Sequence, residues 1–255
     1  MSKNTQFEAL PGRLSRSLSE KLPGKLIVFE GVEGSGKTTQ IQAVQTWLAT
    51  ADLPDSVIAA FPQCVITREP GGTALGQQLR QMLLHPVTDE PLHDRTELLL
   101  YAADRAQHVE GMLKPLLAQG ALILCDRFTD STIAYQGYGR QLDRELIDQL
   151  NQIATHGLQS DLTFWLDLDV ELGLARAQKR GSCDRMEQAT IDFHRRVQQG
   201  FMDLAKAFPD RIVRIDASLS PEQVTQQVQG VLRERLVRWG VECGSKEQGS
   251  REQGR

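Results

Sequence analysis

The chain has 255 residues, which is enough for one α/β domain with a sizeable core. Its formal net charge is −4, so no global basic field favours binding to nucleic acid. No apolar run is long enough to cross a membrane, and no signal-peptide pattern is present near the start. We therefore expect neither a nucleic acid nor a membrane as a partner.

The cysteines and histidines exclude two further classes of structure. The four cysteines, Cys64, Cys125, Cys183 and Cys243, contain no C-x-x-C pair, which favours a reducing cytoplasmic location over a disulfide framework. The five histidines show no metal-ligand spacing, so a structural zinc site is not expected.

The two ends of the chain are expected to be disordered. Residues 1–23 are polar and rich in serine and arginine, as in a transit peptide, but Glu8 and Glu20 favour a plain N-terminal extension. Residues 244–255 have no apolar side chain to bury. The sequence therefore predicts one domain over residues 24–240, followed by a disordered tail over residues 241–255.

Within this domain, apolar runs typical of strands alternate with helical stretches. The expected strands are 25–30, 63–67, 121–125, 162–166 and 211–215. The expected helices lie near 73–84, 96–118, 144–155, 170–179 and 187–208, with a last helix that Ser220 caps and Pro221 begins. This alternation predicts a three-layer α/β/α fold with a five-stranded parallel sheet, and ligands bind such sheets at the carboxyl ends of the strands.

The first strand leads into a phosphate-binding loop. Residues Gly31 to Thr38 satisfy the pattern G-x-x-x-x-G-K-[ST] between a strand and a helix. Backbone N–H groups of such a loop bind phosphate oxygens, Lys37 adds a positive charge and the Thr38 hydroxyl suits Mg²⁺. The expected nucleotide-binding residues are Gly31, Val32, Glu33, Gly34, Ser35, Gly36, Lys37, Thr38 and Thr39.

Glu33 is unusual in this loop because its carboxylate would repel phosphate if it faced inward. Two interpretations are open. Glu33 points to solvent, or it accepts a hydrogen bond from a hydroxyl group of a second substrate.

Two other strands end in charged residues at the same edge of the predicted sheet. Asp126 follows the run 122–125, as an aspartate that orients a magnesium ion would. The next residue, Arg127, is suited to hold a second phosphate bidentately. The turn Arg68-Glu69-Pro70 follows the second strand.

Two segments are candidates for recognition of a base. Tyr101 and Arg105 are four residues apart on a predicted helix and share a face, though Arg105 paired with Asp104 or Glu110 on a wet surface is an equal alternative. Residues 128–140 are rich in hydroxyl and amide side chains directly after the third strand. They are either a recognition segment or a capped helix start.

A basic patch surrounds Gly181 and Ser182. It consists of Arg176, Lys179, Arg180 and Arg185. Such a patch is usually a solvated face, but phosphoryl transfer needs a mobile cationic cover, so the patch is also a candidate lid.

Taken together, these motifs resemble the bacterial thymidylate kinase family, in family order and over roughly residues 25–240. The matching segments are residues 29–39, 67–73, 101–105, 126–127, 131–137 and 184–187. The resemblance implies a nucleoside monophosphate kinase that transfers the ATP γ-phosphate to dTMP with Mg²⁺, which Thr38 and Asp126 would hold. It also implies a homodimer.

The resemblance further implies roles for individual residues. Glu33 would accept from the deoxyribose 3′-hydroxyl, while Arg68 and Arg127 would hold the monophosphate next to a cis Glu69–Pro70 peptide. Tyr101 would stack on thymine and Arg105 would donate to its O4. Thr132 and Gln136 would lie at the base edge, and Tyr135 would exclude a 2′-hydroxyl.

Some relatives have an arginine at the position of Gly34. Because glycine stands here, the resemblance implies that the lid supplies the catalytic cation. Arg180 and Arg185 are the candidates beside Lys37 and Asp126, and Arg176 would contact ATP. The chain departs from the family pattern at Tyr101, which is often phenylalanine, and in the longer segment 53–62.

The main rival is a kinase for another pyrimidine monophosphate on the same scaffold, which only Arg105, Thr132 and Gln136 would distinguish. A regulatory GTPase is disfavoured because the chain has no Asn-Lys-x-Asp motif and no Asp-x-x-Gly motif.

Overall fold

The computed structural model describes residues 23–85, 90–179, 181, 185, 186 and 188–252. Five parallel strands form its sheet in the order β2-β3-β1-β4-β5. The strands are β1 (Lys25–Glu30), β2 (Cys64–Arg68), β3 (Leu122–Asp126), β4 (Leu162–Asp167) and β5 (Ile212–Asp216). Each strand begins and ends within about one residue of its predicted range, so the predicted parallel α/β sheet is confirmed.

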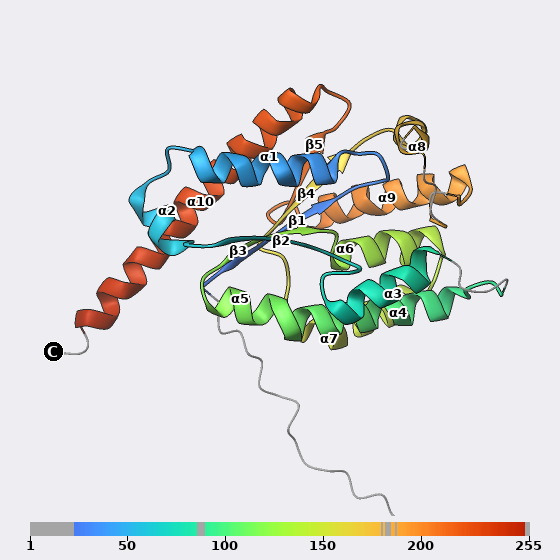
Figure 1. Cartoon of the computed structure of the whole chain (residues 1–255), viewed down its shortest axis with the longest axis horizontal. Coiled ribbons are helices and arrows are strands. Elements are labelled where there is room, and N and C mark those ends of the chain that lie inside the picture. The colour runs from blue at the N-terminus through green and yellow to red at the C-terminus, as the bar shows by residue number, and fades with distance from the viewer. Residues whose placement is uncertain (1–22, 86–89, 180, 182–184, 187, 253–255) are drawn as a thin grey trace, which may run out of the picture.

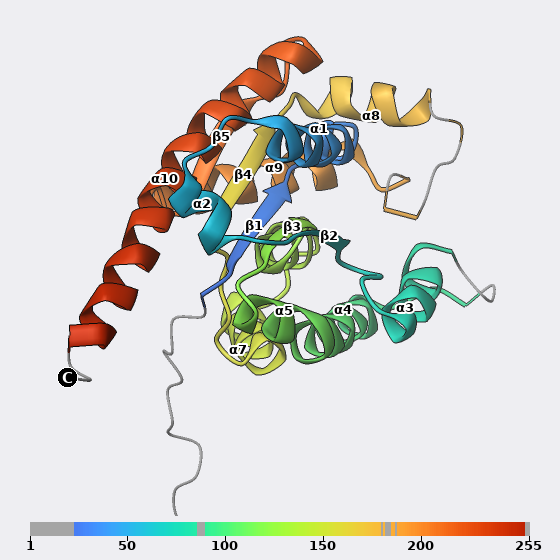
Figure 2. The ribbon, with the colours of Figure 1, turned by 60° about the vertical axis from the view of Figure 1, so that its left-hand side comes forward.

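Helices cover both faces of this sheet. They are α1 (Lys37–Thr50), α2 (Asp55–Ala60), α3 (Ala74–Leu84), α4 (Asp94–His108), η1 (Val109–Leu113), α5 (Lys114–Ala118), α6 (Thr129–Thr132), η2 (Ile133–Gly139), α7 (Arg144–Thr155), α8 (Val170–Gln178), α9 (Ile191–Ala207) and α10 (Pro221–Glu252). Figures 1 and 2 show α1 and α10 on one side of the sheet and α4 and α5 on the other. The predicted three-layer α/β/α arrangement is therefore confirmed.

The alternating side chains of β1 explain the two helical layers. Ile27 and Phe29 are buried in the larger apolar cluster, which includes α1 and α10. Leu26 and Val28 point to the opposite face and join the cluster formed with η1 and α5. Full burial of each such side chain stabilises the fold by roughly 1.5–3 kcal/mol, so β1 holds both layers together.

The register of the strands assembles the site edge. Asp126 is paired with Phe29 of β1 on one side and with Arg68 of β2 on the other. Since all strands run in the same direction, the loops that follow β1, β2 and β3 emerge together. The predicted clustering of the phosphate loop, the Arg68 turn and Asp126 is therefore confirmed.

The helix boundaries differ from the sequence predictions in three places. The helix expected over residues 96–118 consists of α4, the π-helical segment η1 and α5. The longer segment 53–62 contains α2, which the sequence analysis did not predict. Helix α9 begins at Ile191 rather than at residue 187, because the Thr190 hydroxyl caps it by accepting from the Phe193 backbone N–H.

The ends of the domain also differ from expectation in part. Helix α10 starts with the predicted capping box, in which Ser220 and Gln223 bond each other's backbone N–H groups. It continues to Glu252, whereas the composition of residues 241–255 led us to expect disorder. The glutamate, lysine, glutamine and arginine residues of this segment have high helix propensity, which favours a helix here. The extension predicted over residues 1–23 lies outside the described residues except for Pro23.

In the part of the chain that the structure describes, no helix has both the length and the apolar character needed to cross a bilayer.

Candidate active site

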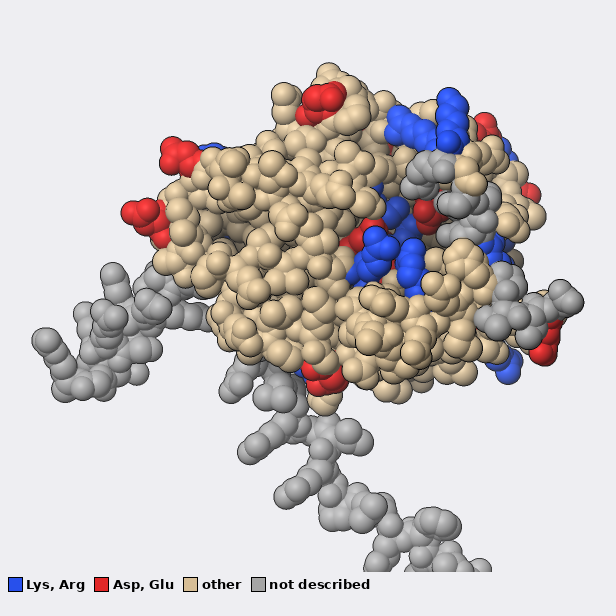
Figure 3. All heavy atoms as spheres, viewed as in Figure 1, with Lys and Arg blue, Asp and Glu red and all other residues tan. Residues whose placement is uncertain are grey.

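A cavity of about 580 Å³ opens at the carboxyl edge of the sheet. Figure 3 shows basic and acidic side chains together in a hollow on this face. The predicted site residues that line the cavity are Glu33, Gly34, Gly36, Lys37, Thr38, Thr39, Arg68, Glu69, Pro70, Tyr101, Arg105, Asp126, Arg127, Thr132, Tyr135, Gln136 and Arg176. Gly31, Val32, Ser35 and Arg185 do not line it, and Arg180 lies outside the described residues.

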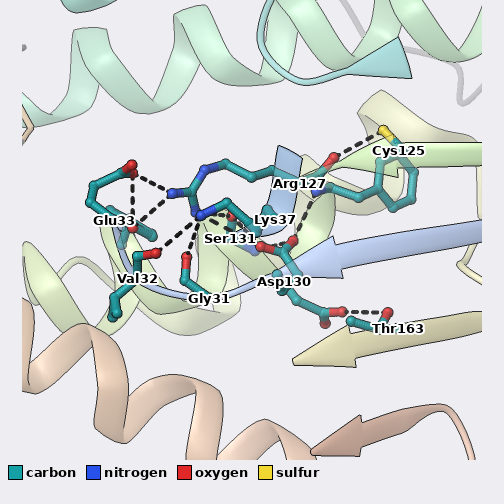
Figure 4. Close-up of polar contacts among 12 residues, drawn as sticks. Gly31, Val32, Glu33, Lys37, Cys125, Arg127, Asp130, Ser131 and Thr163 are labelled. Carbon is teal, nitrogen blue, oxygen red and sulfur yellow. Dashed lines mark hydrogen bonds and ion pairs between the residues drawn. The ribbon is translucent and has the colours of Figure 1, made fainter. Parts of the chain in front are cut away.

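The phosphate loop connects β1 to α1 at one end of this cavity. Gly36 caps α1 with a left-handed backbone, φ 94°, which glycine adopts without strain. The Lys37 ammonium donates to the backbone oxygens of Gly31 and Val32, both at 3.1 Å (Figure 4). Burial, followed by the nearby Arg127 charge, lowers the pKa of Lys37. The loop thus holds a desolvated cation where phosphate would enter.

Helix α8 touches the phosphate loop through two glycines. A Cβ atom on Gly34 would lie 2.2 Å from the Gly173 carbonyl oxygen, and one on Gly173 would lie 2.4 Å from the Glu33 carbonyl oxygen. Gly34 also has a positive φ of 73°. Neither position accepts a side chain unless the loop and α8 separate.

Thr38 and Asp126 bring two oxygen groups together beneath the loop. The Thr38 hydroxyl donates to Asp126 Oδ2 at 3.2 Å, joining the start of α1 to the end of β3. A hydroxyl and a carboxylate are oxygen ligands of the type that Mg²⁺ prefers, and Mg²⁺ commonly takes its remaining ligands from phosphate and water. This pair fits the predicted metal site.

Arg127 lies at the centre of the polar network in Figure 4. It has a left-handed backbone with φ 73°. Its guanidinium pairs with Glu33 and donates to Tyr135 Oη and Ser131 Oγ, each at 3.1 Å. Glu33 therefore faces inward to Arg127, which answers the question of its direction that the sequence left open.

A buried acid supports the backbone after Arg127. Glu30, at the end of β1, accepts from the backbone N–H groups of Phe128 and Ser131 and from the Ser131 hydroxyl. Burial raises the pKa of Glu30 to about 7, against the opposing effect of Arg127. The acid fixes the loop that presents Arg127.

The turn after β2 is held by a second buried network. The Glu69–Pro70 peptide is cis, as the family resemblance implied. Glu69 accepts from Arg105 Nε at 2.8 Å and contacts His108 Nδ1 at 2.9 Å. Its side chain is buried, so this acid anchors the turn to α4.

Arg105 is almost fully enclosed. Besides Glu69, it donates to Thr132 Oγ1, Asn151 Oδ1 and the Phe128 carbonyl oxygen, at 2.8–3.0 Å. It is 2% exposed, so the alternative that placed Arg105 on a wet surface is wrong. Four of its N–H groups have protein acceptors, which leaves one of the five for a ligand.

Two arginines of the candidate lid, Arg176 and Arg185, lie within the described residues. Arg176 lines the cavity and donates to the Ala217 carbonyl oxygen at 3.3 Å. Arg185 pairs with buried Glu97 on α4 and donates to the Leu83 carbonyl oxygen at 3.0 Å. In this structure Arg185 therefore contacts α4 and the end of α3 rather than the phosphate loop.

Two residues in this region were missed by the sequence analysis. Arg80 of α3 lines the cavity and donates to the Pro70 carbonyl oxygen at 3.0 Å, and burial and Arg68 lower its pKa. Glu97 is fully buried beside Gln136 and Arg140. Arg80 could have been noticed in the sequence, because it is an arginine on the helix that starts after the Arg68 turn. No feature of the sequence marks Glu97 as part of this region.

Comparisons with known proteins agree with the geometry. The family model described as "Thymidylate kinase" matches residues 29–228. The chain is 62% identical to the thymidylate kinase of Trichodesmium erythraeum over 222 residues, which is 85% of this chain and 98% of that protein. The thymidylate kinase of Nostoc punctiforme is 60% identical over 214 residues, with 84% and 97% covered.

A solved structure shows the same fold. The crystal structure of thymidylate kinase from Ehrlichia chaffeensis matches with a TM-score of 0.65 and 36% sequence identity. The match covers 82% of this chain and all of that one.

Proposed function

The chain belongs to the thymidylate kinase family and transfers the ATP γ-phosphate to dTMP, and we propose how its residues divide this work. The observation that supports the division is the single cavity in which the phosphate loop, Asp126, Arg127 and the 132–136 segment meet. The donor would lie at the loop, and the acceptor between Arg127 and α4.

On the donor side, the loop from Gly31 to Gly36 would bind the ATP phosphates with its backbone N–H groups. Lys37 would leave its two carbonyl partners to bind phosphate oxygens, because the phosphate charge is the stronger acceptor. Thr38 and Asp126 would hold Mg²⁺, which when bound neutralises charge on the transferring group. Arg176 would contact ATP from the other wall.

On the acceptor side, Arg68 and Arg127 would hold the dTMP phosphate, with Glu69 and Pro70 shaping the turn beside them. Arg80, on the same wall, would add a third cation. Glu33 already lies against Arg127 and would accept from the 3′-hydroxyl. Because Arg127 compensates the negative charge of Glu33, this acid in the phosphate loop need not repel the bound phosphates.

The base would lie against α4 and η2. Tyr101 would stack on the ring, Thr132 and Gln136 would meet its edge, and Tyr135 would crowd a 2′-hydroxyl. Arg105 would offer its remaining N–H group to O4. We further propose that Arg180 or Arg185 supplies the cation for the transfer step, as Gly34 has no side chain.

A coupled assay tests this division of roles. With ATP and Mg²⁺, the chain should use dTMP well ahead of dUMP, UMP, dCMP, dGMP and AMP. Lys37→Ala should lose nearly all turnover while keeping its melting temperature, because the charge is needed only where phosphate accumulates negative charge. A folded Lys37→Ala protein with near-normal turnover would refute the phosphate-loop assignment, and a preference for another pyrimidine would favour the rival substrate.

We propose that a second copy of this chain binds across α4 and α7. These two helices pack together, and exposed apolar side chains stand on both, Leu99 at 56%, Leu146 at 43% and Ile153 at 76% exposure. Leu146 and Ile153 are seven residues apart and so share one face of α7. Exposed apolar groups close together favour an interface.

Sedimentation of Ile153→Lys tests the dimer. The wild type should sediment as a dimer and the variant as a monomer. Ile58→Lys is the matched control, because Ile58 is similarly exposed, at 57%, but lies on α2. A monomeric wild type, or a dimeric Ile153→Lys variant, would reject this interface.

A cytoplasmic location is the last part of the proposal. Free Cys64 and buried, free Cys125 are compatible with a reducing compartment. Cell fractionation followed by detection of the chain tests this location directly.

A further inference from the structure

We propose that Glu97 is a positioning residue that fixes the side-chain amide of Gln136, so that the cavity presents the Gln136 carbonyl oxygen to the base. The inference rests on the proposed base site and adds a residue that has no assigned role there. Glu97 lies on α4 and is fully buried, and Gln136 lies on η2 and is 2% exposed.

Glu97 fixes the orientation of the Gln136 side-chain amide. Gln136 Nε2 donates to Glu97 Oε1 at 2.8 Å. An ionised carboxylate only accepts hydrogen bonds, so the opposite orientation would place the Gln136 oxygen against a carboxylate oxygen. Glu97 therefore selects one of the two amide orientations.

The carbonyl oxygen of the same amide, Gln136 Oε1, has a different environment. Within the described part of the chain, no group donates to Gln136 Oε1. Yet this oxygen is not among the buried side-chain atoms there that lack a partner. Since Gln136 lines the cavity, its oxygen is open to the cavity and to whatever binds in it.

The charge of Glu97 is compensated by arginines. A buried carboxylate without counter-ions is costly, and here two guanidinium groups surround it. Arg140 Nη2 donates to Glu97 Oε2 at 3.2 Å, and Arg185 pairs with the same oxygen. Arg140 also contacts Asp94 at 3.4 Å, so among the described residues of this cluster two cations face two acids.

The consequence is selectivity at the ring nitrogen of the base. A fixed acceptor favours a pyrimidine whose N3 bears hydrogen, as in thymine, and opposes cytosine, whose N3 is an acceptor. A site built to hydrogen-bond one group rejects the analogue without it, because its own polar atom is left unpaired. Glu97 would thus control discrimination without touching the substrate.

The test compares dTMP with 5-methyl-dCMP, which differ only around position 4 and N3. In Glu97→Gln the amide of Gln136 loses its fixed partner, so the ratio of kcat/KM values for these two nucleotides should fall about tenfold. In the Gln136→Met background, Glu97→Gln should leave the ratio unchanged, because it acts only through the amide. A general structural role of Glu97 would instead change activity in both backgrounds.

Controls separate the possible outcomes. Glu171→Gln removes an exposed carboxylate that also pairs with an arginine, Arg195, and should keep the wild-type ratio. If Glu97→Gln does not fold, Glu97→Asp keeps the charge, withdraws it from Gln136 and should lower the ratio to an intermediate value. An unchanged ratio in folded Glu97→Gln, or an equal fall in the Gln136→Met background, would overturn the inference. Failure of the wild type to use dTMP would instead reject the proposed base site.

Discussion

Arg127 and Glu33 form an ion pair in the lining of the cavity, between the residue after β3 and the phosphate loop. The pair explains how an acid persists in a loop that binds anions. Arg127 keeps two further hydrogen-bond partners, Tyr135 and Ser131, so its position does not depend on Glu33 alone.

This relationship leads to a prediction about the sugar. Glu33→Ala should reduce the preference for dTMP over its 3′-deoxy analogue, because the acceptor for the 3′-hydroxyl is removed while Arg127 stays in place. A hydrogen bond to a charged group contributes about 1.5–3 kcal/mol, so the ratio of kcat/KM values should fall roughly 10- to 150-fold. An unchanged ratio would mean that Glu33 serves only as the counter-ion of Arg127.

Two of the lid arginines, Arg180 and Arg185, should behave differently on substitution. Arg180→Ala should lower kcat by about 10³-fold or more if Arg180 is the cation of the transfer step. Arg185→Ala should mainly lower the melting temperature, because Arg185 is bound to Glu97 and to the Leu83 carbonyl oxygen. If Arg185→Ala instead loses kcat at full stability, Arg185 leaves Glu97 during transfer and acts on phosphate.

Glu30 should make folding stability depend on pH. Its pKa rises from 4.5 to about 7 on folding, mainly through burial, so the folded state binds the proton more tightly than the unfolded state. The stability that this proton provides is present below about pH 4.5 and is lost as the pH rises to about 7. Relative to Glu30→Gln, the wild type should lose up to about 3 kcal/mol across this window.

Urea unfolding of both proteins at pH 5, 6, 7 and 8 measures this difference. Asp104, whose burial raises its pKa to about 6, titrates in the same window in both proteins and cancels in the comparison. A constant difference between wild type and Glu30→Gln across the series would contradict the prediction.

Arg105 should be important for stability as well as for the base. Arg105→Met removes four hydrogen bonds and leaves buried Glu69 with only His108 among its side-chain partners. Breaking one side of a buried ion pair costs about 3–5 kcal/mol. Thermal unfolding should show this loss, and adding Glu69→Gln should recover part of it, since the stranded charge is then gone. If the double variant recovers no stability, the loss in Arg105→Met does not come from the unpaired charge of Glu69.

The sequence predicted what depends on local pattern. The strands, the loop from Gly31 to Thr38 and the cap of α10 follow from short-range periodicity and from single residues at defined positions. The surroundings of Arg105 do not, because Glu69 and Asn151 lie 36 and 46 residues away in the chain. The surroundings of Glu97 are even harder to predict from the sequence, because its partner Arg185 is 88 residues distant.

The close approach of Gly34 and Gly173 has an evolutionary consequence. The family resemblance implies relatives that carry an arginine at the position of Gly34 and supply a cation from the loop itself. In this chain a side chain at residue 34 would collide with the α8 backbone at 2.2 Å, and the left-handed backbone there adds strain. Gaining a loop arginine in this chain would therefore require a shift of α8 or of the loop as well as a substitution at residue 34.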